Sequence, residues 1–178
     1  MLKTRPATLS DAQGLLKIYN RYVTGTPISL ELSPPSLEEF RGRMERILGT
    51  YPWFVAEDES GLVGYAYAGP FNFREGYRFT AEVTIYLDES ATGRGIGKRL
   101  YSVLLDTLKA QQIHTVIAGV TLPNHASVGL HESLGFKKVA HYTAVGHKFG
   151  KWWDVGYWQA SLSGAGEVEN HQVEEEAE

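Results

Sequence analysis

The stretch from Phe79 to Gln111 constrains the fold of this chain more than any other part of its sequence. Its first nine residues, FTAEVTIYL, alternate between apolar and polar side chains, which predicts a strand with one face toward a core. The following segment is rich in glycine, and large aliphatic residues then recur at every fourth position from Ile96, which predicts a helix. A strand, a glycine-rich turn and a helix in succession therefore define the centre of the predicted fold.

Shorter patterns predict further elements on both sides of this centre. Before it we expect a strand at 2–7, a helix with Ser10 as its N-cap, a helix after Ser36, and a hairpin formed by PWFVAED and GLVGYAYAGPF. After it we expect a buried strand, HTVIAGV, a helix that ends at Gly135, and two last strands. This order is typical of an α+β fold with three layers, in which one mixed sheet is covered by helices.

The last sixteen residues differ from the rest of the chain in composition. They hold six of the 21 acidic residues and none of the 17 lysines and arginines. A segment of this kind cannot bury enough apolar surface to fold, which predicts a disordered tail at 163–178 behind a single domain at 1–162. The net charge of −4 comes from this tail, so the domain itself is close to balanced and no nucleic-acid partner is expected.

Several classes of protein are excluded by what the sequence lacks. The 178 residues include no cysteine, which excludes disulfides, thiolate metal sites and cysteine nucleophiles, and we expect no metal cofactor. No apolar run approaches the length of a membrane span, so no membrane partner is expected. The first residues, MLKTRPATLS, lack the apolar stretch of a secretory signal, which favours a cytoplasmic location.

The glycine-rich turn predicts an anion site. At the start of a helix, N–H groups without intrahelical partners point outward, and the helix dipole favours a negative charge. The glycines let an anion approach the backbone closely, and Arg94, Lys98 and Arg99 add positive charge. A plain flexible turn ahead of a core helix is the structural alternative.

Two common phosphate motifs do not fit this turn. A Walker-type loop requires glycine at 92 and serine or threonine at 99, where the chain has Thr92 and Arg99. A dinucleotide fingerprint places its third glycine one position later than Gly97. A nucleotide-binding domain is therefore a distant alternative.

The segment ATGRGIGKRL instead resembles the pyrophosphate-binding loop of the GNAT acetyltransferase superfamily, written Q/R-x-x-G-x-G/A. Thr92, Gly95 and Gly97 occupy its defined positions, and because Thr92 replaces the usual Gln or Arg, Arg94 is expected to supply the missing charge. The resemblance implies acetyl-CoA as co-substrate. The residues expected to hold it from the strand and the turn are Ile85, Tyr86, Leu87, Gly93, Arg94, Gly95, Ile96, Gly97 and Lys98.

A second region carries a narrower resemblance. PNHASVGLHESLGF and GHKFGKWWDVGYWQ are similar to segments of phosphinothricin N-acetyltransferases and their relatives that acetylate methionine sulfoximine. The resemblance covers about residues 2–161. It implies a mixed, twisted sheet of about seven strands whose central strands splay apart, flanked by about four helices. It also implies a homodimer, which is common in this group.

The resemblance also assigns roles to single residues. Glu82 lies on the non-core face of the central strand and is the expected general base for the acceptor amine. Asn124, Ser127 and His131 share one face of the helix that ends at Gly135, and the resemblance places Asn124 and Ser127 at the cofactor. His131 is either a proton donor for the departing thiolate or a residue that only orients or packs. The expected acceptor-binding residues are Glu82 together with Phe73, Arg74, Tyr77 and Arg78.

The resemblance therefore implies an N-acetyltransferase that moves acetyl from acetyl-CoA directly to the primary amine of a small, amino-acid-like substrate. Two alternatives stay open. The acceptor is a different amine, such as a protein N-terminus, a polyamine or an antibiotic, or the domain binds acyl-CoA without catalysis and serves regulation. Thiol release on addition of amines distinguishes the catalytic readings from the silent one.

Overall fold

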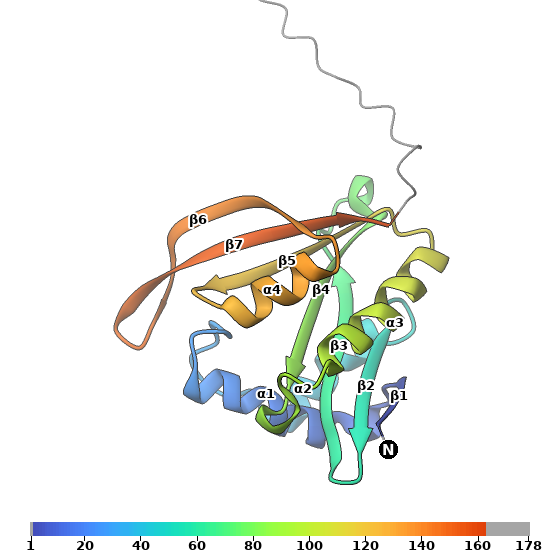
Figure 1. The fold of residues 1–178 in the computed structure, drawn as a ribbon. Helices are drawn as coiled ribbons and strands as arrows, with labels where there is room; N and C mark the ends of the chain where they lie inside the picture. Colours follow the sequence, from blue (N-terminus) through green and yellow to red (C-terminus); the bar gives the residue numbers. More distant parts are fainter. Residues whose placement is uncertain (1, 163–178) are drawn as a thin grey trace, which may run out of the picture.

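A computed structural model describes residues 2–162 of the chain (Figure 1). The predicted tail at 163–178 lies outside the described residues. The helices are α1 (Ala12–Gly25), α2 (Leu37–Ile47), α3 (Ile96–Ala110) and α4 (His125–Ser133). The strands are β1 (Lys3–Pro6), β2 (Trp53–Asp58), β3 (Gly61–Pro70), β4 (Thr80–Leu87), β5 (Thr115–Leu122), β6 (Lys137–Lys148) and β7 (Lys151–Ser161).

The strands form one mixed sheet in the order β1-β2-β3-β4-β5-β7-β6. All neighbours are antiparallel except the central pair, β4 and β5, which run parallel and are joined through α3. This pair holds together only from Thr80 opposite Thr115 to Glu82 opposite Ile117, after which the two strands diverge (Figure 1). Strand β5 then pairs with β7 over its whole length, so the sheet consists of two halves that are joined at one end.

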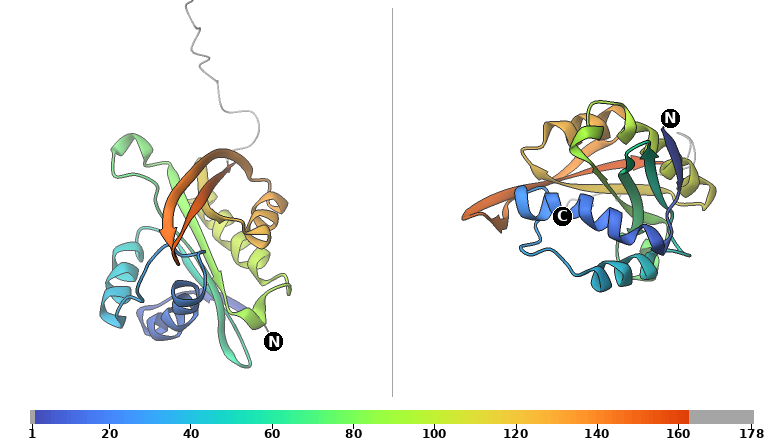
Figure 2. Two further views of the ribbon diagram at one scale, coloured as in Figure 1. Left: turned by 90° about the vertical axis from the view of Figure 1, so that its left-hand side faces the viewer. Right: turned by 90° about the horizontal axis from the view of Figure 1, so that it is seen from below.

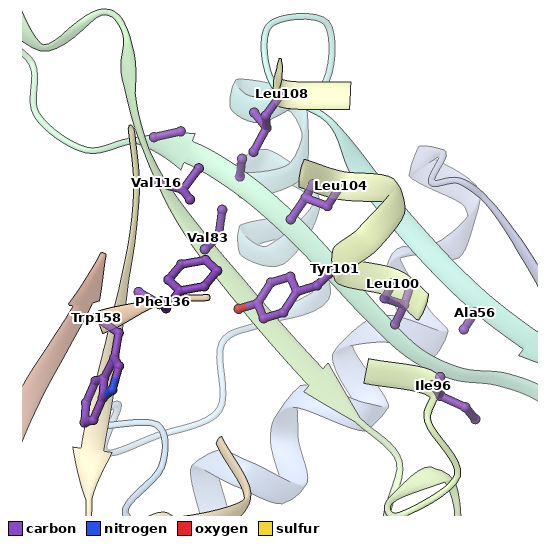
Figure 3. Packing of buried hydrophobic residues seen from close by; sticks show 14 of the residues in the cluster. Ala56, Val83, Ile96, Leu100, Tyr101, Leu104, Leu108, Val116, Phe136 and Trp158 are labelled. Atoms are coloured by element: carbon purple, nitrogen blue, oxygen red, sulfur yellow. The ribbon is translucent and has the colours of Figure 1, made fainter. Parts of the chain in front are cut away.

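Two layers of helices cover this sheet. Helices α1 and α2 lie on one face, and α3 and α4 lie on the other (Figure 2). The core under α3 includes the predicted four-residue repeat, with Leu100, Leu104 and Leu108 fully buried where α3 packs on β2, β3 and β4 (Figure 3). A second core under α1 and α2 is rich in aromatic side chains, such as Trp53 and Tyr65. The predicted three-layer α+β fold with splayed central strands is confirmed.

The helix starts show what sequence reasoning captured locally. Ser36 caps α2 as predicted, since its side chain accepts a hydrogen bond from the Glu39 amide at 3.1 Å. The prediction that Ser10 caps the first helix is wrong. A short 3-10 turn capped at Thr8 comes first, and Asp11 both closes this turn and binds the guanidinium of Arg5, so α1 begins only at Ala12.

Candidate active site

The divergence of β4 from β5 leaves main-chain groups without a strand partner. The Asp88 amide donates to the Val63 carbonyl of the strand before β4, and amides alternate in direction along an antiparallel strand. The Tyr86 amide therefore faces β3, whereas the Ile85 and Leu87 amides face the gap toward β5. A buried amide without a partner is costly, so the gap presents donors that a ligand can satisfy.

One of these two amides is already occupied. The Leu87 amide donates to the Tyr22 hydroxyl at 3.3 Å, and this hydroxyl donates to the Leu87 carbonyl at 2.6 Å. Of the predicted backbone contacts, Tyr86 is paired within the sheet and Leu87 is bound to α1. The Ile85 amide is thus the donor that faces the gap and has no strand opposite it.

The glycine-rich turn connects β4 to α3 in the conformation that an anion cradle requires. Gly93 and Gly95 have φ angles of +71° and +73°, a left-handed region in which other residues are strained. Gly95 is the N-cap of α3 and brings no capping side chain, so the amides of the first helical turn point outward unpaired. A Cβ at Gly97 would lie 3.1 Å from the Leu130 side chain, so glycine there lets α3 start close against α4.

The basic side chains near the turn differ in what they contact. Arg94, which the sequence suggested for the cradle, has partners outside it in the structure. Its guanidinium binds Asp58 at 3.1 Å and the Ser90 carbonyl at 3.3 Å, which ties the turn to the β2–β3 hairpin. Lys98 lines the cavity beside the turn, and so does Arg21 of α1, which forms an ion pair with Asp88 at 2.9 Å. Sequence reasoning missed Arg21 because nothing local distinguishes it from a solvated helix residue.

A cavity of about 780 Å³ begins at this turn and runs between α1, β4 and α4. Asn124 and Ser127 line its far end. The side-chain carbonyl of Asn124 caps α4 by accepting from the Ser127 amide at 3.1 Å, so its two amide N–H groups are the donors it has for a ligand. A smaller cavity shares Ile28, Ile85, Asn124 and Ser127 with the large one and extends it into the gap between β4 and β5.

Glu82 lies where the paired part of β4 and β5 ends. Its carboxylate is close to β5, since a Cβ on Gly119 would lie 3.8 Å from Glu82 Oε1. The side chain is reached by solvent, yet the atoms packed around it raise the pKa of Glu82 above its ordinary value. Among the described residues no cation forms an ion pair with it, so burial acts on its pKa unopposed. A carboxyl of this kind is suited to accept a proton.

His131 and Tyr101 form a buried pair on the wall of the smaller cavity. The imidazole Nδ1–H donates to the Ser127 carbonyl at 2.7 Å, and Nε2 accepts from the Tyr101 hydroxyl at 2.9 Å. Burial lowers the pKa of His131 and raises that of Tyr101, so both groups are neutral at pH 7. Tyr101 was missed as a site residue because its position in the α3 repeat is also that of a core residue.

The predicted acceptor-binding residues lie apart from both cavities. Phe73 is 90% exposed, and the Arg74 guanidinium stacks on its ring at 5.2 Å. Tyr77 and Arg78 are exposed as well, on the connection that enters β4 two residues before Glu82. None of these four residues lines either cavity, and of the five predicted acceptor-binding residues only Glu82 lies at the gap, beside Gly119 of β5.

No group of three or more His, Asp or Glu side chains within residues 2–162 is arranged to hold a metal ion. In the same range, no helix has the length and apolar character that crossing a membrane requires.

The Thr92 hydroxyl, which takes the place of the usual longer side chain, donates to the Glu89 carbonyl at 2.8 Å and so stabilises the turn itself. The groups available to a ligand are therefore main-chain amides, Lys98, Arg21 and the Asn124 amide.

Comparisons with known proteins agree with this geometry. Residues 4–156 match the family described as acetyltransferase (GNAT) domain. The phosphinothricin N-acetyltransferase of Streptomyces viridochromogenes is 39% identical over 158 residues, covering 89% of this chain and 86% of its own. The L-methionine sulfoximine/L-methionine sulfone acetyltransferase of Pseudomonas paraeruginosa is 35% identical over 160 residues, covering 89% of this chain and 93% of its own.

A solved structure has the same fold. The GNAT superfamily phosphinothricin acetyltransferase from Sinorhizobium meliloti, in complex with acetyl-CoA, superposes with a TM-score of 0.88 at 37% identity. The match covers 91% of this chain and 89% of that one.

Proposed function

The chain belongs to the GNAT acetyltransferase family, and from this membership we propose that its acceptor is the α-amine of a small amino-acid analogue of the phosphinothricin and methionine sulfoximine type. The protein is an acetyl-CoA-dependent N-acetyltransferase. One observation carries the assignment of the site. A cavity leads from the unpaired amides of the glycine turn, past the Ile85 amide, to the gap beside a carboxyl of raised pKa, Glu82.

The turn and the cavity bind different parts of the cofactor. The diphosphate of acetyl-CoA lies on the free amides at the start of α3, where Lys98 and Arg21 add positive charge. The pantetheine arm follows the large cavity past the Asn124 amide. This arrangement brings the thioester into the gap between β4 and β5, and no metal ion takes part in the proposed reaction.

Glu82 removes the proton of the acceptor amine in the proposed reaction. An α-amine with a pKa of about 8 is mostly protonated at pH 7 and cannot attack a carbonyl. Glu82 accepts its proton directly or through a water molecule, and the free amine then attacks the thioester carbon. The C–N bond forms and the C–S bond breaks, and coenzyme A leaves as the thiolate, which takes up the second proton that the nitrogen loses as the amide forms.

The remaining groups stabilise what develops during this attack. The Ile85 amide points into the gap and donates to the oxyanion of the tetrahedral intermediate. The Tyr101 hydroxyl lies on the wall of the smaller cavity and donates its single proton to His131 Nε2, so it stabilises the departing thiolate when this proton turns from Nε2 toward the sulfur. Because both imidazole nitrogens are bonded, we assign His131 the orienting role rather than that of a proton donor.

The relatives and the exposed side chains indicate the acceptor and the assembly. The names of the relatives supply the substrate class. Arg74 and Arg78 are proposed to bind its carboxylate when a substrate or a second chain brings the connection at 71–79 toward the gap. Exposed apolar side chains on the β6–β7 hairpin, such as Trp152 at 66% exposure, support a homodimer. We place the enzyme in the cytoplasm, with access to acetyl-CoA.

A thiol-release screen tests the proposed substrate class. The protein and acetyl-CoA are mixed with phosphinothricin, methionine sulfoximine, methionine sulfone, ordinary amino acids, polyamines and a short peptide. We expect kcat/KM for the best analogue to exceed that for the peptide and the polyamines by about 100-fold or more, since a site shaped for one class rejects another by several kcal/mol. A preference for the peptide or a polyamine would assign a different acceptor, and release with none of the amines would favour the silent binding domain.

A further inference from the structure

Lys148, at the end of β6, is buried although it carries an ammonium group. Its side chain is 2% exposed, and burial lowers its pKa. Nζ donates to the carbonyls of Val23 and Ser29, both at 2.6 Å, and none of the ion pairs among the described residues includes it. Lysine is rarely buried without a carboxylate partner, so its two carbonyl contacts need a reason.

The two carbonyls belong to different parts of the chain. Val23 lies in the last turn of α1, where carbonyls lack intrahelical partners and the helix dipole favours a cation. Ser29 lies in the connection after α1, here called the 26–31 segment. The Thr121 hydroxyl of β5 donates to the adjacent Ile28 carbonyl at 3.3 Å, so side chains from β5 and β6 hold two successive carbonyls of this segment.

The other side of the 26–31 segment is held by α1 and α2. The Ser29 hydroxyl bonds the Tyr19 hydroxyl at 2.8 Å, and Tyr19 also donates to Glu31 at 2.8 Å. Glu31 in turn forms an ion pair with Arg43 of α2. The segment thus bridges the two halves of the sheet, which part from each other beyond Glu82.

This bridge also forms part of the proposed transfer site. The Ile28 side chain lines both cavities, at the point where the large one opens into the gap between β4 and β5, and Thr26 lines the large one. We propose that Lys148 is a positioning residue, which fixes the 26–31 segment across the gap and so sets the wall against which thioester and acceptor meet. The proposal rests on the proposed function for its kinetic consequence, but not for its structural one.

Hydrogen exchange tests the structural part without any substrate. Lys148→Met keeps the length of the side chain and removes both hydrogen bonds, and Lys151→Met removes an exposed lysine from the same hairpin as a control. We expect amide exchange in the 26–31 segment to rise about tenfold or more in Lys148→Met, as for a segment that opens locally, and to stay unchanged in the glycine turn and in the control. Unchanged exchange at 26–31 in folded Lys148→Met would overturn the proposal.

Kinetics with the best amine from the screen test the functional part. In Lys148→Met we expect the KM for the acceptor to rise about tenfold, with CoA affinity within about threefold of the original, because the wall is displaced while the diphosphate cradle is intact. Lys148→Arg, which keeps the charge and donors, is expected to recover part of this loss. If Lys148 only stabilises the fold, its loss lowers the melting temperature and leaves the acceptor KM unchanged. That result would refute the positioning role.

A second variant covers the case in which Lys148→Met does not fold. Thr121→Val is nearly isosteric and removes only the hydrogen bond to the Ile28 carbonyl. We expect a smaller change in the same direction, about threefold in the acceptor KM, since one of the two ties from this side of the sheet remains. An unchanged acceptor KM in this variant would overturn the proposal equally. An enzyme that transfers acetyl to none of the amines would refute the proposed function, and the exchange measurement would still decide the structural part.

Discussion

Glu82→Gln is expected to lower kcat by about 10²–10⁴-fold at neutral pH, the usual contribution of a general base. Glutamine has nearly the same shape but cannot accept the proton of the amine. Because no cation holds the Glu82 carboxylate among the described residues, the substitution breaks no ion pair, and affinity for coenzyme A is expected to be unchanged. A thiol-release assay measures turnover, and calorimetry measures CoA binding, so the two effects are separated. Glu45→Gln on the exposed side of α2 is the matched control.

The raised pKa of Glu82 gives this prediction a signature in pH. In the original enzyme kcat/KM rises with pH as Glu82 loses its proton, at a pKa above the ordinary value of about 4.3, and this limb is absent in Glu82→Gln. The folded protein binds this proton more tightly than the unfolded chain, so stability falls as pH rises from the unfolded pKa through the folded one. Glu82→Gln is therefore at least as stable as the original at pH 7, and the difference disappears below about pH 4. Unchanged turnover would remove Glu82 from the mechanism.

Gly95→Val is expected to weaken coenzyme A binding by about 100-fold or more. A hydrogen bond to a charged group contributes about 1.5–3 kcal/mol, and each 1.4 kcal/mol is a factor of ten in affinity. Nothing lies within 4 Å of a Cβ at Gly95, so the side chain would project into the space that the diphosphate needs. The φ angle of +73° additionally strains a β-branched residue and moves the first amides of α3.

The backbone strain needs a control of its own. Gly49, after α2, has a φ angle of +98° with nothing within 4 Å of a Cβ, and it lines neither cavity. Gly49→Val is thus expected to lose about 1–3 kcal/mol of stability, as Gly95→Val does, while it keeps its affinity for coenzyme A. Equal CoA affinity in Gly95→Val and Gly49→Val would refute the anion cradle at the turn.

The parts of the site that the sequence predicted are those that local patterns determine. The alternation of β4, the four-residue repeat of α3 and the glycines between them are encoded within neighbouring residues, and so is the helical face that carries Asn124 and His131. The divergence of β4 from β5 followed from the resemblance and not from either strand alone. Glu82 was found because it lies on the non-core face of an alternating strand next to the turn, where the resemblance also places a general base.

The parts that the sequence did not predict depend on contacts between distant segments. Arg94 was predicted at the cradle, and the sequence did not predict its hydrogen bond to Asp58 of the β2–β3 hairpin. Tyr22 of α1, 65 residues away in the sequence, forms hydrogen bonds with the main-chain amide and carbonyl of Leu87. Tyr101 belongs at once to the core and to the cavity wall, and periodicity cannot separate these roles. From the sequence, Lys148 is expected at the surface, whereas the fold buries it.

The central claim is that main-chain amides at the start of α3 hold a diphosphate and so direct a thioester toward Glu82. Crystals of the protein with bound coenzyme A test it most directly. We predict that diphosphate oxygens lie about 3 Å from the amide nitrogens of the glycine turn and of the first turn of α3, with the sulfur in the gap between β4 and β5 near the Ile85 amide. Coenzyme A bound at another place, with this turn empty, would contradict the claim.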